Sequence, residues 1–227
     1  AQSVHGIALL QKQNMRAPSC AVCHGTHGAA PPGFEEVANV CGSCHTATQD
    51  YYLKSKHASD KAGTPKCVTC HGRYDVGVPS EAMFTGAGER DCTACHANTT
   101  PPAKAVQDLS DQLTASDKML HDAEAALKRA ANSALIVAPE ELTLREARTN
   151  LITARAAQHT LNLTTVKQRT DKANVASKKV LAAAEKAMND NILRRQFMVI
   201  GLAVLALAVT SLWIIRRELY RQLPPKE

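Results

Sequence analysis

Apolar residues are most concentrated near the C-terminal end of the chain. Residues 197–215 form a run of 19 positions without a charged side chain. As a helix rising ~1.5 Å per residue, this run is about 28 Å long, which matches the hydrocarbon thickness of a bilayer. Arginine pairs flank both ends, and Trp213 and Tyr220 lie near one of them, as is common at membrane interfaces. The pattern predicts a single C-terminal transmembrane helix.

Residues 103–196 have apolar positions at helical spacing. They fall into two series, Leu109, Leu113, Leu120 and Leu127, then Leu144, Ala147, Leu151, Ala154 and Leu161. Residues 132–138 separate the series, and Pro139 with two following glutamates is typical of a first helical turn. We therefore expect an antiparallel helical hairpin that turns near residue 136 and continues as a stalk to the membrane.

The stalk has one candidate break. No Gly or Pro interrupts residues 140–200, so the chain can remain helical throughout that range. At residues 159–165, however, Asn162 precedes a β-branched stretch and is suited to cap a new helix.

The first 102 residues lack such periodicity and are rich in turn formers, which predicts short helices and irregular loops. The whole chain has only one Trp, four Tyr and three Phe, too few for an ordinary core in this region. We expect a mainly α protein with irregular loops, divided into an N-terminal domain (1–102), a hairpin and stalk (103–196), a transmembrane helix (197–215) and a tail (216–227).

All eight cysteines fall in four copies of Cys-x-x-Cys-His. Two thiols three positions apart can each add to a vinyl group of one porphyrin, and the following histidine can then reach the iron, so the motif predicts covalent c-type haem. Four copies predict four covalently bound haem c groups. The attachment cysteines are Cys20, Cys23, Cys41, Cys44, Cys67, Cys70, Cys92 and Cys95, and the proximal iron ligands are His24, His45, His71 and His96.

Zinc and disulfides are the competing interpretations. Cys-x-x-Cys pairs about twenty residues apart suit a tetrahedral zinc site, and cysteines in an exported chain often form disulfides. Neither explains a histidine after every pair, because four thiolates complete a zinc site without it. The haem interpretation is therefore favoured, and the porphyrins would supply the apolar interior that residues 1–102 lack.

The charge is uneven. Residues 1–102 hold eight basic and eight acidic side chains, so the net charge of +6 lies in residues 103–227. Haem propionates would make the N-terminal domain acidic. Since no basic stripe is interleaved with stacking aromatics, we expect no nucleic-acid partner.

The haem domain contains a duplicated unit, and five histidines remain as distal ligands. His5 and His57 occupy equivalent places ahead of the two units, and His27 lies too close to its own motif to reach that haem's far face, so we expect it to serve a neighbour. With a turn near residue 136, His159 lies about 15 Å from the haem domain and His121 about 30 Å, which favours His159 as the fourth ligand. Met15, Met83 and Tyr74 remain alternatives, since Met and Tyr also ligate haem iron.

Several segments resemble a known family. These are Ser3-Val4-His5-Gly6, Ala17-Pro18-Ser19-Cys20, Cys23-His24-Gly25-Thr26-His27-Gly28, residues 40–45 and residues 67–72. They resemble membrane-anchored multihaem cytochromes c of the cytochrome c3/c7-like superfamily, and residues 154–159 look like the family's C-terminal helical segment. The resemblance implies periplasmic electron transfer, often beside a quinol-oxidising membrane complex. Tyr74 departs from the pattern, which would have a histidine there.

These features predict an electron carrier rather than an enzyme. It would relay electrons between a cytochrome b-type quinol-oxidising complex and soluble periplasmic redox partners, anchored in the lipid bilayer of a bacterial inner membrane. The start at Ala1-Gln2 suits a mature exported chain, with the haem domain in the periplasm and the C-terminus in the cytoplasm. The alternative is a multihaem reductase of a small nitrogen or sulfur oxyanion with one open haem. A haem sensor is disfavoured because the tail is too short for an output domain.

Overall fold

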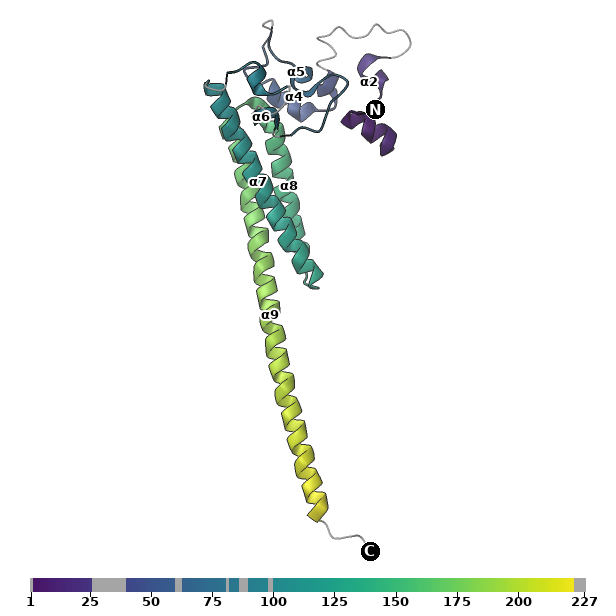
Figure 1. Ribbon diagram of the computed structural model, residues 1–227, viewed down its shortest axis with the longest axis vertical. Coiled ribbons are helices and arrows are strands. Elements are labelled where there is room, and N and C mark those ends of the chain that lie inside the picture. The colour runs from purple at the N-terminus through teal and green to yellow at the C-terminus, as the bar shows by residue number, and fades with distance from the viewer. Residues whose placement is uncertain are drawn as a thin grey trace.

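The computed structural model describes residues 2–25, 40–59, 63–80, 82–85, 90–97 and 100–222. Within these ranges the chain is mainly helical and contains no strand. Short helices gather at one end of the molecule, and three long helices run away from them, the last extending far beyond the other two (Figure 1). The predicted mainly α fold is confirmed at this level.

The N-terminal region consists of short helical segments, and the same order of elements occurs twice. In each half, the first Cys-x-x-Cys-His motif is a five-residue α-helix and the second starts a 3₁₀ turn. The elements are α1 (Val4–Gly6), the π-helical η1 (Ile7–Gln11), α2 (Cys20–His24), η2 (Cys41–Ser43), α4 (Thr46–Tyr52), α5 (Cys67–His71), α6 (Ala82–Thr85) and η3 (Cys92–Ala94).

This region has no core of its own among the described residues. Every buried apolar side chain in the described part of the chain lies at residue 106 or beyond. The residues that are buried before position 100 are Gly42, Ser55 and Gly72, none of which contributes apolar bulk. The described residues before position 100 therefore form no buried apolar core of their own.

Three long helices follow: α7 (Pro101–Asn132), α8 (Ala138–Ala157) and, after the 3₁₀ turn η4 (Gln158–Thr160), α9 (Leu163–Gln222). Pro101 and Pro102 occupy the first turn of α7, where their missing N–H groups cost no helical hydrogen bond. The helix thus begins two residues before the predicted start. Helix α8 begins as predicted, with Pro139 and two glutamates in its first turn.

Two ion pairs mark the register between α7 and α8. Arg155 pairs with Asp117, and Arg148 pairs with Glu124 through a 2.7 Å contact. Because residue 155 faces 117 and residue 148 faces 124, His159 faces a position near residue 113. This register agrees with the predicted turn near residue 136 and brings the C-terminal end of α8 back towards the N-terminal region.

Helix α8 ends at Ala157, and the chain then reverses direction once more. Leu161 has a left-handed φ of 54°, and the Asn162 side chain accepts hydrogen bonds from the N–H groups of Thr164 (2.9 Å) and Thr165 (3.3 Å), which caps α9. Helix α9 then packs against both α7 and α8. The predicted hairpin is present, but the upper part of the predicted stalk is the third helix of a bundle.

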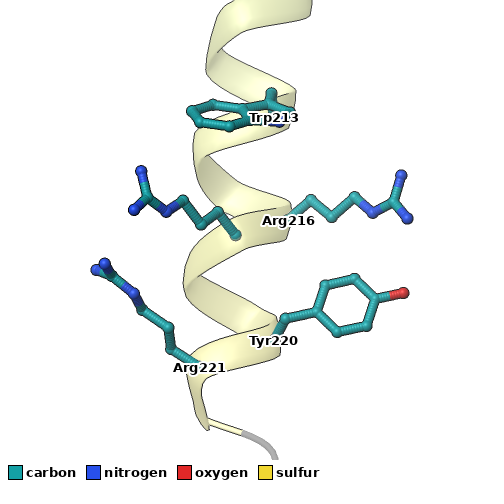
Figure 2. A pocket seen from close by; sticks show the side chains of 5 residues that line it. Trp213, Arg216, Tyr220 and Arg221 are labelled. Carbon is teal, nitrogen blue, oxygen red and sulfur yellow. The ribbon is translucent and has the colours of Figure 1, made fainter.

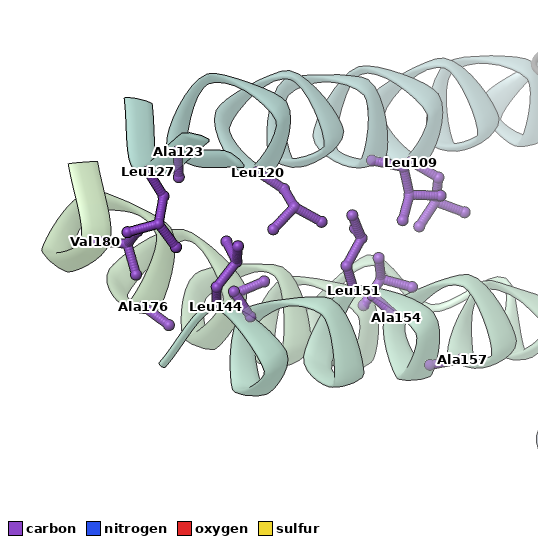
Figure 3. Close-up of a cluster of buried hydrophobic side chains, with 14 residues drawn as sticks. Leu109, Leu120, Ala123, Leu127, Leu144, Leu151, Ala154, Ala157, Ala176 and Val180 are labelled. Atoms are coloured by element: carbon purple, nitrogen blue, oxygen red, sulfur yellow. The ribbon is translucent and has the colours of Figure 1, made fainter. Parts of the chain in front are cut away.

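The bundle buries a continuous apolar core. Leucines from α7 and α8 point inwards towards small residues and valines of α9, as Figure 3 shows for Leu109, Leu151 and Val180. The cluster comprises Leu109, Leu113, Leu120, Ala123, Leu127, Leu144, Ala147, Leu151, Ala154, Ala157, Val166, Ala173, Ala176 and Val180. Small residues dominate the α9 face, so the three helix backbones can approach closely.

Met188 packs against the buried Ala126, Ala130 and Ala184, and beyond it helix α9 leaves the bundle and continues alone (Figure 1). It contains the one segment of the described chain that is long and apolar enough to cross a membrane, with a mean hydropathy of 2.5 and none of it buried within the molecule. At the far end of this segment the Arg217 guanidinium lies over the Trp213 ring and that of Arg216 lies over the Tyr220 ring. Figure 2 shows Trp213, Arg216, Tyr220 and Arg221 projecting outwards from helix α9.

The N-terminal region is attached to the upper end of the bundle. Helix α4 contacts α8 and η4, and Tyr51 packs against the bundle core. Helix α6 and the turn η3 contact α7. The Val4 N–H donates to the Val76 carbonyl (2.8 Å), which ties the start of the chain to the segment after the third motif.

Candidate cofactor-binding site

The four Cys-x-x-Cys-His motifs adopt two local structures. In the first and third motifs, the α-helices α2 and α5 present both cysteines and the histidine within one and a half turns, and each ends at a glycine. Gly25 and Gly72 have φ angles of 77° and 82°, values that side chains with a Cβ rarely adopt. The chain thus turns sharply after His24 and His71, which leaves each imidazole at the C-terminal end of its helix.

Each motif histidine faces one other ring, and the four facing pairs have nearly equal spacing. The ring centres lie 6.0–6.2 Å apart in every pair. The pairs are His45 with His5, His24 with Tyr74, His96 with His57, and His71 with His159.

This spacing is within the range of ordinary ring pairs, and it also suits an atom held between two rings. Imidazole nitrogens bind metal ions at roughly 2 Å, so two imidazoles on opposite sides of one ion hold their ring centres about 6 Å apart. Three pairs consist of two histidines at 6.1 or 6.2 Å and therefore fit this requirement. The donor set in each is two imidazoles beside a pair of thiols.

The ring of His5 is positioned by the N-terminal helix. The Ser3 hydroxyl caps α1 by accepting from the Gly6 N–H (3.0 Å), and the Val4–Val76 hydrogen bond anchors the same turn. His5 therefore sits on a short but capped helix that the rest of the domain holds in place.

The ring of His57 is positioned by the loop after α4. The Tyr52 hydroxyl lies within hydrogen-bonding distance of the carbonyls of His57 (3.1 Å) and Pro65 (2.8 Å). The buried Ser55 hydroxyl accepts from the His57 N–H (3.2 Å). These contacts fix the backbone on both sides of the imidazole.

His159 occupies the turn between α8 and α9, outside the N-terminal region in sequence. Its Nδ1 lies 3.0 Å from the Ala156 carbonyl, so an Nδ1–H donates there and the lone pair is left on Nε2. The orientation of the ring is therefore set by the end of the bundle, while the ring itself faces His71.

Burial lowers the pKa of three of these imidazoles. Desolvation is the largest cause for His57, His71 and His159, and for His57 and His71 the neighbouring rings of His96 and His159 add to it. A lowered pKa favours the neutral ring at pH 7, which is the form with a lone pair for a metal ion.

The thiols of successive motifs lie near one another. Burial raises the pKa of the Cys23 and Cys70 thiols, and the nearby thiols of Cys41 and Cys95, respectively, raise it further. A hydrogen bond between the thiols of Cys41 and Cys67 raises the pKa of the first and lowers that of the second. The four motifs thus follow one another in space in the order in which they occur along the chain.

The thiols are not gathered into zinc-type sites. Among the described residues, no group of three or more His, Cys, Asp or Glu side chains is arranged to hold a metal ion directly.

The other candidate ligands are placed differently. His121 is exposed on α7, where it contacts Asp117 (3.5 Å) and Glu124 (3.3 Å) and faces no motif histidine. Met15 is 85% exposed, and Met83 is part-buried. His27, predicted as a distal ligand, lies outside the described residues.

Tyr74 is the residue to which sequence reasoning gave too little weight. The sequence offered it only as one alternative ligand, and the structure places its ring opposite His24. The available signal was the internal repeat, in which Tyr74 stands where the first unit has His27. The repeat shows that the two positions correspond but not which motif each one faces.

Comparison with protein-family models, with curated proteins and with solved structures gave no match to this chain. The function is therefore inferred from the residues and their geometry.

Proposed function

We propose that the chain is a membrane-anchored tetrahaem cytochrome c that relays electrons. The observation that carries the proposal is the set of four facing ring pairs, one for each Cys-x-x-Cys-His motif, at 6.0–6.2 Å. Scattered surface histidines would not place one ring opposite each motif histidine at the spacing that iron between two imidazoles requires.

The residues present fit covalent haem in both parts of the donor set. The eight cysteines would carry the thioether bonds, the four motif histidines would be proximal ligands, and His5, His57 and His159 would be distal ligands to three of the irons. When bound, haem supplies one-electron transfer, with a potential set by axial ligands, burial and hydrogen bonding. The chain supplies ring orientation, through contacts such as the Nδ1–H of His159 on the Ala156 carbonyl.

The missing interior of the N-terminal region supports the same proposal. A region of about 100 residues without a buried apolar side chain among its described positions has no ordinary source of stability. Four porphyrins would supply large apolar surfaces that the short helices can enclose.

The order of the motifs in space supports a relay. Thiols of the first motif are near those of the second, the second near the third, and the third near the fourth. Redox groups attached at these points would form a continuous series, and a site with two imidazole ligands leaves no iron position for a substrate. Such a series exchanges electrons rather than transforming a bound molecule.

The length of α9 sets the distance between the proposed haem groups and the membrane. Thirty-four residues separate Leu163, beside the N-terminal region, from Phe197, where the apolar segment begins. At ~1.5 Å per residue this is about 50 Å for an upright helix. No single electron-transfer step covers that distance, so the chain does not take electrons directly from a quinol within the bilayer.

The proposed donor is therefore a membrane complex, such as a cytochrome b-type quinol-oxidising complex, with a redox centre presented at this height outside the bilayer. Covalent haem attachment belongs outside the cytoplasm, so we place the N-terminal region in the periplasm of a bacterial inner membrane and the C-terminus in the cytoplasm. Haem propionates would give the N-terminal region an acidic surface suited to a basic soluble partner, with association that weakens at high salt.

The decisive experiment is purification of the full chain in mild detergent from a host that attaches c-type haem. We expect a Soret band, four covalent haem adducts by mass spectrometry and copurification of a quinol-oxidising complex. Fewer than four adducts would reject the tetrahaem proposal. Four adducts without a copurifying membrane complex, only a soluble redox partner, would reject the proposed donor.

One observation favours a second candidate, a reductase of a small nitrogen or sulfur oxyanion. Tyr74, not a histidine, faces His24, so one of the four proposed haems has a different distal environment. Turnover of nitrite or hydroxylamine by the reduced purified protein would support this function, and its absence with intact electron transfer would leave the relay alone.

A further inference from the structure

The end of α9 farther from the N-terminal region carries arginines and aromatic rings side by side. Trp213, Arg217 and Arg221 are spaced four residues apart, so they follow one another along one face of the helix. Arg216 and Tyr220 form a second pair at the same spacing on the adjoining face. The five side chains line one open groove, the arginine groove (Figure 2).

The rings hold two of the guanidinium groups in place. The Arg217 guanidinium carbon lies 5.5 Å from the centre of the Trp213 ring, and that of Arg216 lies 5.4 Å from the centre of the Tyr220 ring. Such cation–π contacts use the positive charge and leave guanidinium N–H groups free to donate. The groups are thus positioned for an acidic acceptor, and less side-chain entropy is lost when one binds.

A phosphate diester suits this set of donors. Guanidinium groups bind phosphate oxygens through paired, charge-assisted hydrogen bonds. The uncharged run 197–215 ends within the arginine groove, so in a bilayer the guanidiniums lie where hydrocarbon gives way to headgroups. The phosphate diesters at that depth are phospholipids, and the Trp213 ring adjoins the guanidiniums on the side of their acyl chains.

The groove at the opposite end of the apolar segment has a different lining. It is formed by Arg195, Gln196, Val199 and Ile200, with one guanidinium and no aromatic ring. Both ends of the segment carry positive charge, but of these two grooves the arginine groove alone combines several guanidiniums with rings that hold them. This difference separates a built site from the general attraction of basic residues to an anionic surface.

We infer that the arginine groove binds the headgroup of an anionic phospholipid. A zwitterionic headgroup such as phosphatidylcholine carries a cation beside its phosphate, so the arginines favour a lipid with net negative charge, such as phosphatidylglycerol. The inference rests on the membrane anchor of the proposed function and does not depend on haem.

Trp213 is the only tryptophan in the chain, so its fluorescence reports on the arginine groove directly. Fifty residues of helix, about 75 Å, separate it from Leu163 beside the N-terminal region, too far for strong quenching by the proposed haem groups.

The test places the full chain, with its haems attached, in phosphatidylcholine nanodiscs. Part of the lipid is replaced by phosphatidylglycerol or phosphatidylcholine with brominated acyl chains, which quench a nearby tryptophan. At equal mole fraction we expect brominated phosphatidylglycerol to quench more strongly, with a binding preference of about fivefold.

Three variants separate geometry from charge. Arg217→Lys keeps the charge but removes the planar set of donors, so the preference for phosphatidylglycerol should fall towards one. Tyr220→Leu removes the ring that holds Arg216 and should also reduce the preference, although the charge is unchanged. Arg194→Lys makes the same exchange at the other end of the segment and should leave the preference unaltered. Circular dichroism and haem content verify that each variant is intact.

Three results would overturn the inference. The first is equal quenching by the two brominated lipids in the unaltered chain. The second is an unchanged preference in Arg217→Lys, which would mean attraction by charge alone. The third is loss of the preference when inorganic phosphate is added at constant ionic strength, which would mean that the groove binds a free anion. In each case brominated lipid still quenches Trp213, so the membrane anchor stands, whereas a tryptophan that neither lipid quenches would reject the anchor itself.

Discussion

The two halves of the molecule obtain their order from different sources. The bundle buries leucine, valine and alanine side chains from three helices in one continuous core. The N-terminal region has no buried apolar side chain among its described residues, although it contains eight cysteines and most of the histidines. The bundle is thus specified by its own apolar pattern, whereas the N-terminal region, under the proposed function, would be organised around bound haem.

Blocking haem attachment should break this comparison most sharply. With all eight cysteines replaced by alanine, we expect residues 1–100 to lose their structure because no chain-derived core remains, while the bundle keeps its helical content. Hydrogen exchange read by mass spectrometry would show rapid exchange before residue 100 and protected amides in α7, α8 and the upper part of α9. Protected amides in α4 or α5 of this variant would contradict the proposed dependence.

A cavity in the core of the bundle should destabilise the bundle and leave the N-terminal region unaffected. Leu151 is 2% exposed in the core, so Leu151→Ala should lower the free energy of unfolding of the bundle by about 2–5 kcal/mol. The neighbouring Ile152 is 65% exposed, and Ile152→Ala should change it by less than about 0.5 kcal/mol. Urea unfolding followed by circular dichroism measures both, and the haem content should not change in either variant.

His159 joins the two halves, so its loss should affect one proposed haem site only. His159→Ala removes the ring opposite His71, and we expect one haem to change from low spin to high spin in EPR. His121→Ala is the matched control, because that imidazole faces acidic side chains on α7 and no motif histidine. An unchanged spectrum for His159→Ala, or the altered one for His121→Ala, would reject the assignment.

The smallest effect is expected from the surface ion pairs that mark the register of α7 and α8. Arg148→Met should lower the free energy of unfolding by only about 0.2–1 kcal/mol, because the Arg148–Glu124 pair is solvent-accessible. The difference between this variant and the unaltered chain should shrink in 1 M salt. A loss of several kcal/mol would mean that the pair, rather than the apolar core, determines the packing of these helices.

Much of the bundle could be predicted because its determinants are local. The leucine spacing of α7 and α8, the first turn at Pro139 and the cap at Asn162 all act within a few residues, and the structure has each of them. The return of α9 along the hairpin was not predicted, because small residues such as Ala173, Ala176 and Ser177 give a weak apolar pattern. These small residues contribute by packing closely against the leucines of the other two helices.

The candidate site also has features that the sequence predicts and features that it does not. The spacing of each Cys-x-x-Cys-His motif places two thiols and an imidazole together without help from the rest of the chain, and nineteen uncharged residues make a helix long enough to cross a bilayer. Which ring faces each motif histidine depends instead on segments far apart in sequence, such as His71 and His159 or His24 and Tyr74. The sequence by itself determined the motifs and helices, and only the tertiary structure decided these pairings, because a pairing is set by how the segments pack and not by the number of residues between them.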